Sequence, residues 1–212
     1  MIKTICLVAL LGFALVLGAC LHTPNTTTAT KPCEGNPTIT SENDFVAMAR
    51  CESISGPLRF DSQGWLTSID MPRLTTVVGD LIIRSNDALT SVNTRALTSV
   101  GEDLGIAGND SLASLNMPSL TTVDGSMIVG INNTLTSIDM PALTSVNGGL
   151  TIGANTALTS LEGMSGLTTV VGDLYLRGND CLSQAEAEAF AARISVGGGV
   201  TVYDNGANYP CN

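Results

Sequence analysis

The chain has 212 residues, a formal net charge of −10, and only 4% aromatic residues among 44% hydrophobic ones. So acidic a protein is a poor match for the phosphate backbone of nucleic acids, and no nucleic-acid partner is predicted. The one histidine, His22, precedes the repeated part of the chain. That part therefore has no histidine for a Ser/His/Asp or Cys/His arrangement, and no catalytic residue is predicted.

The first 19 residues predict a secretion signal. After Lys3, the apolar run from Ile5 to Leu17 is too short to span a bilayer but suits the core of a signal peptide. The run ends in Leu17-Gly18-Ala19-Cys20, which resembles the bacterial lipoprotein box. The resemblance implies cleavage before Cys20 and acylation of its thiol, and an ordinary secretory signal cleaved nearby is the alternative. A lipoprotein of this kind contacts the membrane only through its lipid, at the outer membrane or cell surface.

Residues 20–32 are rich in threonine and lack apolar periodicity, which predicts a flexible tether between the lipid and a folded domain. Four cysteines belong to that domain, and they allow three pairings: Cys33, Cys51, Cys181 and Cys211. Two precede the repeats and two follow them, so pairing within each end would staple two caps. A zinc site is the alternative, but the close Cys or His spacings typical of zinc ligands are missing. No metal and no cofactor are predicted.

Helix signals occur only at the two ends of the domain. Ser41-Glu42-Asn43-Asp44 precedes an apolar segment that ends at Ala49, and Ser183-Gln184-Ala185-Glu186 precedes residues 187–194. Each tetrapeptide resembles a capping box, in which a serine hydroxyl and an acidic side chain satisfy the first backbone N–H groups of a helix. Short helices at both ends would shield the terminal turns of a repeat array from solvent.

A leucine returns every 23 residues along the middle of the chain, at Leu66, Leu89, Leu112, Leu135 and Leu158. A fixed period of this length is typical of a solenoid, in which each turn packs on the turns before and after it. Each repeat reads Leu-x-x-Ile, Leu-x-x-Val and Leu-x-Ile-x-x-Asn, and only the third part alternates as a strand does. Its inward pairs run from Leu58 and Phe60 to Val200 and Val202, which predicts seven stacked parallel strands.

A leucine-rich-repeat horseshoe is the alternative architecture for such a period. It needs a helix or similar segment in the remaining half-turn, which here reads Thr-Ser-Ile-Asp-Met-Pro in two copies. β-branched residues and a proline make that segment a poor helix. The sequence therefore favours an all-β solenoid, a parallel β-helix of 23-residue turns with short helical caps, over residues 33–211.

Two sets of recurring positions are candidates for a defined role. One asparagine per turn predicts a structural amide ladder that satisfies backbone groups at a bend: Asn86, Asn109, Asn132, Asn155, Asn179 and Asn205. On the solvent side of the predicted sheet the residues vary from turn to turn. Large apolar, aromatic and arginine side chains there form a candidate partner face: Arg59, Ile82, Arg84, Ile128, Tyr175, Arg177 and Tyr203.

The domain resembles the receptor L domain, the β-solenoid module of insulin-receptor and epidermal-growth-factor-receptor ectodomains, and also fungal cell-wall proteins. The resemblance rests on Cys33-Glu34-Gly35, the helix before Cys51, the segment Ile54–Leu58, the repeated Leu-Thr-Ser-Ile and Leu-Thr-Ser-Val turns, and the helix between Cys181 and Cys211. It implies a right-handed solenoid without catalytic activity, a Cys33–Cys51 and a Cys181–Cys211 disulfide, and ligand binding on a sheet face. The lipoprotein box and the single domain depart from that family, so its partners and signalling do not carry over.

Together these features predict a surface-anchored lipoprotein that acts as a non-catalytic recognition module for a protein or a cell-surface glycan. A structural lipoprotein of the cell envelope is the first alternative, since the tether is short and the array regular. A polysaccharide-active enzyme is the second, because two carboxylates at a set separation suffice for glycoside hydrolysis. The scarcity of aromatic platforms for sugar rings disfavours it.

Overall fold

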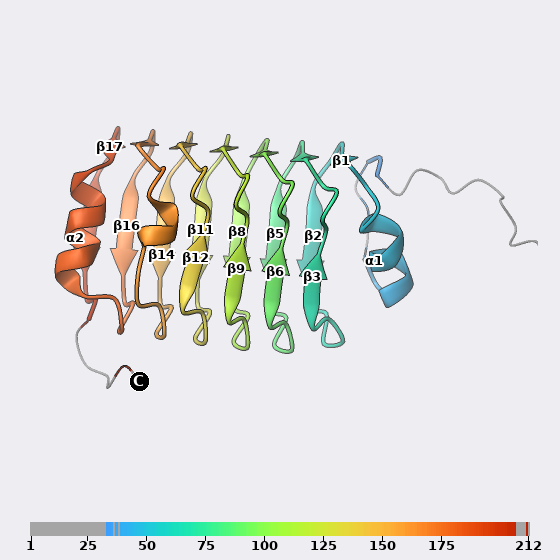
Figure 1. Cartoon of the computed structure of the whole chain (residues 1–212), viewed down its shortest axis with the longest axis horizontal. Coiled ribbons are helices and arrows are strands. Elements are labelled where there is room, and N and C mark those ends of the chain that lie inside the picture. Colours follow the sequence, from blue (N-terminus) through green and yellow to red (C-terminus); the bar gives the residue numbers. More distant parts are fainter. Residues whose placement is uncertain (1–32, 36, 38, 207–210, 212) are drawn as a thin grey trace, which may run out of the picture. The chain divides into compact units, whose positions relative to one another are not determined.

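The computed structural model describes residues 33–35, 37, 39–206 and 211, and these form a parallel β-solenoid whose turns stack along one axis (Figure 1). The predicted signal peptide, Cys20 and the rest of the tether over residues 20–32 lie outside the described residues. Within the described ranges, no helix combines the length and the apolar character needed to cross a bilayer.

The largest sheet, sheet A, consists of seven four-residue strands, each in register with the strand one turn later, so that Leu58 lies beside Leu81 and Phe60 beside Ile83. All of its strand pairs are parallel. Its strands are β2 (Leu58–Asp61), β5 (Leu81–Arg84), β8 (Leu104–Ala107), β11 (Met127–Gly130), β14 (Leu150–Gly153), β16 (Leu174–Arg177) and β18 (Val200–Tyr203). The seven predicted rungs are therefore confirmed.

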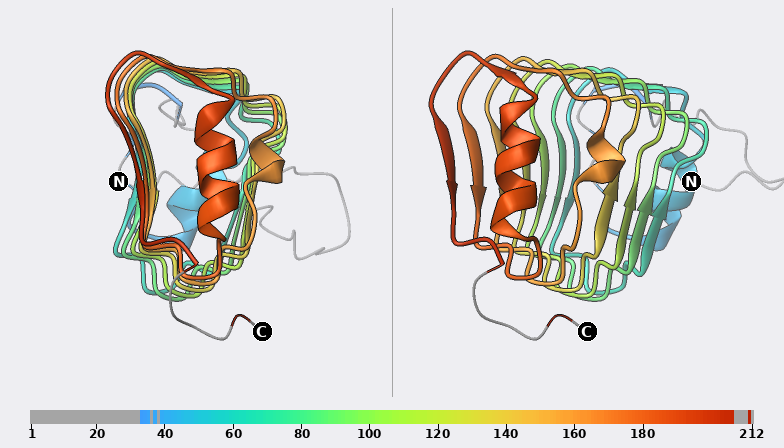
Figure 2. Two further views of the ribbon diagram at one scale, coloured as in Figure 1. Left: turned by 90° about the vertical axis from the view of Figure 1, so that its left-hand side faces the viewer. Right: turned by 60° about the vertical axis from the view of Figure 1, so that its left-hand side comes forward.

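Two further parallel sheets close the coil. Sheet B holds seven two-residue strands: β1 (Ser53–Ile54), β4 (Thr76–Val77), β7 (Ser99–Val100), β10 (Thr122–Val123), β13 (Ser145–Val146), β15 (Thr169–Val170) and β17 (Ser195–Val196). Sheet C holds four: β3 (Ser68–Asp70), β6 (Ser91–Asn93), β9 (Ser114–Asn116) and β12 (Ser137–Asp139). Sheet C occupies the half-turn where a horseshoe would need a helix. The view along the axis shows a closed outline (Figure 2), so the β-solenoid is confirmed over the horseshoe.

The fifth repeat departs from the others because it carries one extra residue. After a single bridge between Ser137 and Ser160, sheet C gives way to a 3₁₀ turn, η1 (Glu162–Met164). Two glycines permit the tight fit of this segment on the preceding turn. A side chain at Gly163 would collide with the carbonyl oxygen of Ile138, and one at Gly166 with that of Pro141. The extra residue is thus absorbed locally, and sheets A and B continue past it.

The core is a narrow apolar column inside the coil. In sheet A both inward residues of every strand from β2 to β16 are buried, because each turn covers the one before it. The terminal strand β18 is the exception to the predicted pattern. Val200 is 54% exposed and Val202 is only partly buried, since β18 is the last strand of sheet A in the described part of the chain.

Both predicted cap helices are present. Helix α1 (Glu42–Met48) begins after Ser41, whose hydroxyl accepts the N–H of Asp44, and α2 (Gln184–Ala192) begins after Ser183, which accepts the N–H of Glu186. Helix α2 ends two residues before the expected Ile194. The expected return bond of the second capping box is absent from the described residues. The Glu186 carboxylate instead accepts the N–H of Leu161 at 3.1 Å, which ties α2 to the fifth repeat.

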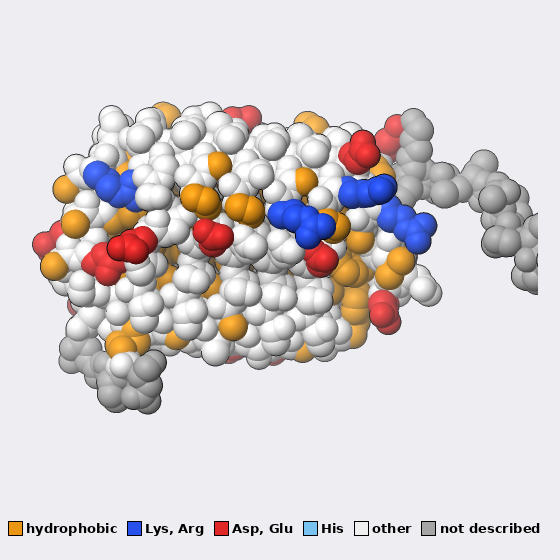
Figure 3. Space-filling model, viewed as in Figure 1, with side chains coloured by type: hydrophobic (Ala, Val, Ile, Leu, Met, Phe, Trp, Pro, Cys, Tyr) orange, Lys and Arg blue, Asp and Glu red, His pale blue; other side chains and the backbone are white. Residues whose placement is uncertain are grey.

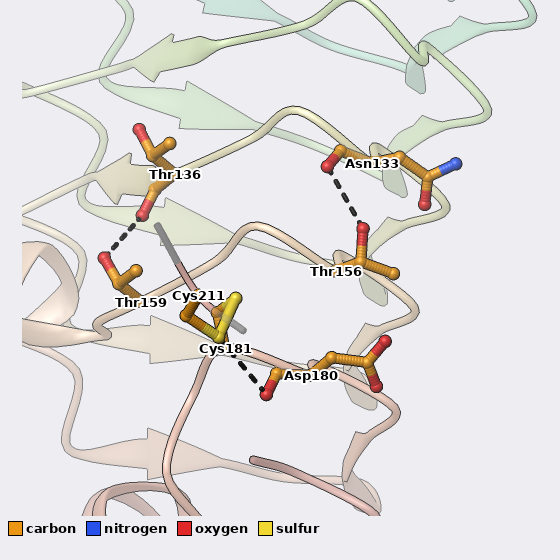
Figure 4. Close-up of a disulfide and its surroundings, with 7 residues drawn as sticks. All are labelled: Asn133, Thr136, Thr156, Thr159, Asp180, Cys181 and Cys211. Atoms are coloured by element: carbon orange, nitrogen blue, oxygen red, sulfur yellow. Dashed lines mark hydrogen bonds between the residues drawn. A yellow bond between two sulfur atoms is a disulfide. The ribbon is translucent and has the colours of Figure 1, made fainter. Parts of the chain in front are cut away.

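The four cysteines of the domain form two disulfides, one at each end. Cys33 bonds Cys51 beside α1, and Cys181 bonds Cys211 beyond the last repeat (Figure 4). The pairing implied by the family resemblance is therefore present, and these thiols are not zinc ligands. Each bridge restricts the unfolded chain across a cap, where a solenoid lacks a neighbouring turn on one side.

Threonine side chains connect successive turns on the outside of the coil. In one column each hydroxyl donates to the carbonyl one turn earlier, from Thr75 to Glu52 at 2.6 Å through Thr168 to Thr144 at 3.2 Å. A second column follows the same rule, with the Thr159 hydroxyl 3.3 Å from the carbonyl oxygen of Thr136 (Figure 4). These hydroxyls are used as structural donors between turns.

Candidate binding face

The predicted asparagine ladder runs along one buried corner of the solenoid. All six asparagines have buried side chains, and each amide makes the same contacts. Asn109 is an example: its Oδ1 accepts a hydrogen bond from the backbone N–H of Asn86 at 3.1 Å, and its Nδ2 donates one to the carbonyl oxygen of Ile83 at 3.1 Å. Every amide thus satisfies two backbone groups that the bend leaves unpaired. The ladder is a structural element, as predicted.

A glutamine completes each end of the ladder: Gln63 occupies the ladder position of the first turn, as the repeat pattern indicates, and Gln184 lies beyond the last turn. At the first turn the N–H of Gln63 donates to Asn86 Oδ1 at 2.8 Å. At the last turn Asn205 donates from its backbone and its side chain to Gln184 Oε1, both at 3.3 Å. Gln184 comes from helix α2, outside the repeat register, so periodicity could not identify it as the terminal acceptor.

The residue immediately before each ladder position has a left-handed backbone, and we call these seven residues the turn column: Ser62, Ser85, Gly108, Ile131, Ala154, Gly178 and Asp204. Their φ angles lie between 52° and 67°. Glycine adopts this conformation freely, whereas a β-branched residue does so only under strain. Ile131 has φ 56° and is 57% exposed, so it combines backbone strain with an apolar side chain in solvent. Ile131 is not among the residues predicted from the sequence, although its place before a ladder asparagine was an available signal.

The residues of the predicted partner face lie on the outside of sheet A. Alternation places Arg59, Ile82, Ile128 and Tyr175 in one column and Arg84, Arg177 and Tyr203 in the next. All are exposed except Ile82, which is half-buried. Its Cδ1 lies over Gly105, where an added Cβ would come within 3.0 Å of it. The predicted residues thus share one face.

The N-terminal part of this face is neutralised by ion pairs. Arg59 Nη2 lies 2.5 Å from Asp80 Oδ2. Arg84 contacts both carboxylate oxygens of Asp61, with Nε 2.7 Å from Oδ1 and Nη2 3.3 Å from Oδ2. Both arginines are therefore already matched by acidic neighbours, and an anionic partner gains less from them than the sequence suggested.

The C-terminal part is hollowed into a shallow groove of about 450 Å³. Its floor comes from the small outward residues Ala107, Gly130 and Gly153. A Cβ added at Gly130 would lie 3.0 Å from the carbonyl oxygen of Gly153. A Cβ added at Gly153 would lie 3.1 Å from the carbonyl oxygen of Arg177. Ile128 and Ile131 from one turn and Arg177 and Tyr203 from later turns also line the groove.

Arg177 differs from the other two arginines of the face. Its Nη1 donates to the Tyr203 hydroxyl at 3.2 Å, and this hydrogen bond raises the pKa of the Arg177 guanidinium. No carboxylate among the described residues forms an ion pair with it. Asp204 also lines the groove but forms no ion pair with Arg177, so the groove combines an apolar floor with an arginine and an aspartate that are not paired with each other.

No family model, curated protein or solved structure matches the chain, so its resemblance to receptor L domains stays a prediction. Within the described part of the chain, no three His, Cys, Asp or Glu side chains are grouped so that they could hold a metal ion.

Proposed function

We propose that the protein is a surface-anchored lipoprotein whose solenoid binds another protein or a cell-surface glycan without catalysing a reaction. One observation carries the proposal. The scaffold positions repeat from turn to turn, whereas the outward face of sheet A varies and exposes Ile128, Tyr175 and Tyr203, with Ile131 exposed in the adjoining turn column. Large exposed apolar and aromatic side chains on one face of a rigid scaffold are typical of contact surfaces.

The opposite side of the solenoid supports the choice of face. On the side that carries sheet C and α2, charged side chains of both signs are interspersed with scattered hydrophobic ones (Figure 3). Such a mixture is typical of an ordinary solvated surface. The contrast favours sheet A as the side that meets a partner.

The lipid anchor is tested separately, by replacing Cys20 with serine. We expect the parent protein to fractionate with membranes and to incorporate a labelled fatty acid, and the Cys20→Ser variant to do neither. A variant that stays in the membrane fraction would contradict the anchor. Protease treatment of intact cells then reports whether the solenoid faces outward.

Binding is tested with the mature full-length protein and its Arg84→Glu, Arg177→Glu double variant as paired baits on intact cells. We expect a partner that the parent captures saturably and the double variant does not, with both proteins showing the same thermal unfolding. Absence of any saturable partner, together with a solenoid shielded from protease, would favour the structural envelope lipoprotein. Cleavage of an envelope polysaccharide by purified protein would favour the enzyme.

A further inference from the structure

We propose that the groove on the C-terminal half of sheet A binds an extended peptide segment of another protein, one that carries apolar side chains and a carboxylate. This inference rests on the proposed recognition function and names its partner. The residues that carry it are Ile128, Ile131, Gly130, Gly153, Arg177 and Tyr203, which line or floor one groove.

Ile131 is the first observation. At φ 56° a β-branched side chain is held in a conformation that glycine occupies elsewhere in the same column, at Gly108 and Gly178. Its side chain is 57% exposed, so burial in the core offsets little of that strain. Strained, exposed residues of this kind concentrate where a side chain must be presented to a ligand. Ile128, 46% exposed on the adjoining strand, extends the same apolar surface.

The charged neighbours of the arginines favour the C-terminal end of the sheet A face as the binding site. Arg59 and Arg84 are held by Asp80 and Asp61, whereas the Arg177 guanidinium, among the described residues, donates to the Tyr203 hydroxyl and to no carboxylate. Asp204 lines the groove as well but forms no ion pair with Arg177, so a ligand carboxylate placed beside Arg177 would form a charge-assisted hydrogen bond without breaking an existing ion pair.

The polar groups in the groove favour a peptide over a glycan. The strands that contribute Gly130 and Gly153 pair on both sides, and their carbonyls accept the N–H groups of Gly108 and Ile131. Because the backbone groups of the floor are already hydrogen-bonded within the sheet, only a few side chains, such as Arg177 and Tyr203, can form hydrogen bonds with a ligand. A sugar, with a hydroxyl on most carbons, would leave many groups unpaired there. Apolar peptide side chains need contact area rather than hydrogen bonds, and a peptide that lays them on the floor can keep its backbone N–H and C=O groups toward solvent in so shallow a groove.

The dimensions of the groove also fit a peptide. It extends over five successive strands of sheet A, from β8 to β18. At about 4.8 Å between strands this is roughly 19 Å, the length of about six residues of extended chain.

The probe is a phage-displayed library of random twelve-residue peptides, selected on the mature full-length protein. We expect enriched peptides to share apolar residues and at least one Asp or Glu. The best peptide, made synthetically, should bind the Ile131→Gly and Arg177→Gln variants at least about tenfold more weakly, and Arg84→Gln within about twofold of the parent. Ile131→Gly suits this purpose because glycine fits the backbone at that position.

The carboxylate is tested by changing the acidic residue of the peptide to its amide. We expect a loss of about tenfold against the parent protein and no further loss against Arg177→Gln, because the two changes remove the same contact. Losses that multiply would overturn the assignment. So would a library that yields no binding peptide, or peptides that bind Ile131→Gly as tightly as the parent.

Two other results would replace the proposed occupant. Self-association of the parent protein that Ile131→Gly abolishes would identify a second copy of this chain, and an envelope oligosaccharide that competes with the peptide would identify a glycan. A cellular partner that still binds Ile131→Gly and Arg177→Gln would leave the recognition function standing and refute the groove. Loss of every saturable partner would refute the recognition function instead.

Discussion

Two adjacent positions at one corner of the solenoid contrast sharply. The ladder position holds asparagine in six turns and is buried in each, whereas the residue before it is Ser, Gly, Ile, Ala or Asp. Both positions have a fixed backbone conformation. They differ because the ladder amide fills backbone hydrogen bonds within the coil, whereas the turn column needs only to tolerate a positive φ. The residue type is therefore restricted at the ladder position but variable at the position before it. A binding surface can develop at the variable position.

The largest effect is expected from Asn132→Leu. This change keeps the approximate size of the side chain but leaves the N–H of Asn109 and the carbonyl of Ile106 without the partners that Asn132 supplies. Two buried backbone groups without hydrogen bonds should lower the free energy of unfolding by about 3 kcal/mol, measured by denaturant titration.

The matched control is the neighbouring asparagine. Asn133 is exposed, and its side chain donates only to Asp110 at 2.8 Å. We expect Asn133→Leu to change the free energy of unfolding by less than about 0.5 kcal/mol. Equal effects of the two substitutions would show that burial of the ladder is not what distinguishes these positions.

The repeat period accounts for how much of the fold could be predicted. A 23-residue spacing with Leu-x-Ile alternation fixes the register of sheet A, and recurring asparagines mark the corner that turns the chain. Features outside that period were not predictable from it. Gln184 ends the ladder from a helix, and Val200 is exposed because it occupies the last strand.

The candidate site was predicted only in part, for a different physical reason. Alternation correctly placed seven residues on the outside of sheet A, but which of them matter depends on neighbours in other turns. The ion pairs of Arg59 and Arg84 depend on the rotamers of long side chains, and the groove depends on the absence of side chains at Gly130 and Gly153. A search of the sequence for large outward residues does not detect a groove that forms where the outward residues are small.

A smaller effect, of opposite sign, is expected from Ile131→Gly. Glycine relieves the left-handed strain of a β-branched residue but increases the chain entropy of the unfolded state. Since the Ile131 side chain is 57% exposed, little burial is lost. The net result should be a gain of up to about 1 kcal/mol in the free energy of unfolding.

Ala154→Gly is the matched comparison, because Ala154 has φ 55° without a branched Cβ. We expect it to gain less than Ile131→Gly in the same titration. If Ile131→Gly instead destabilised the protein, the isoleucine would be packing against the solenoid rather than being held ready for a partner. That result would weaken the contrast between the turn column and the ladder.

The smallest effect concerns Asp44, which makes specific hydrogen bonds as Asn132 does but is only half-buried, whereas Asn132 is fully buried. Its carboxylate accepts the Thr40 N–H at 3.1 Å, the Thr40 hydroxyl at 3.0 Å and the Ser41 hydroxyl at 2.9 Å. These bonds, led by the Thr40 N–H, lower the pKa of Asp44 below its ordinary value of 3.8. A carboxyl whose pKa is lower in the folded state stabilises that state above its unfolded pKa, and this contribution is lost as the pH falls through the folded pKa.

Asp44→Asn should therefore lower the thermal midpoint slightly at pH 7, with the difference from the parent shrinking toward zero as the pH falls below about 3.8. Thr40→Val is the control: it removes one hydroxyl donor but keeps the backbone one, so its effect should follow the same pH trend with a smaller amplitude. A difference that stays constant from pH 7 to pH 2 would mean that the charge of Asp44 is irrelevant. The hydrogen bonds of the Asp44 cap would then stabilise the fold to the same extent whether or not the carboxyl is charged. Burial of the side chain, rather than its number of hydrogen bonds, would then explain why substitutions in the ladder cost more than substitutions at the cap.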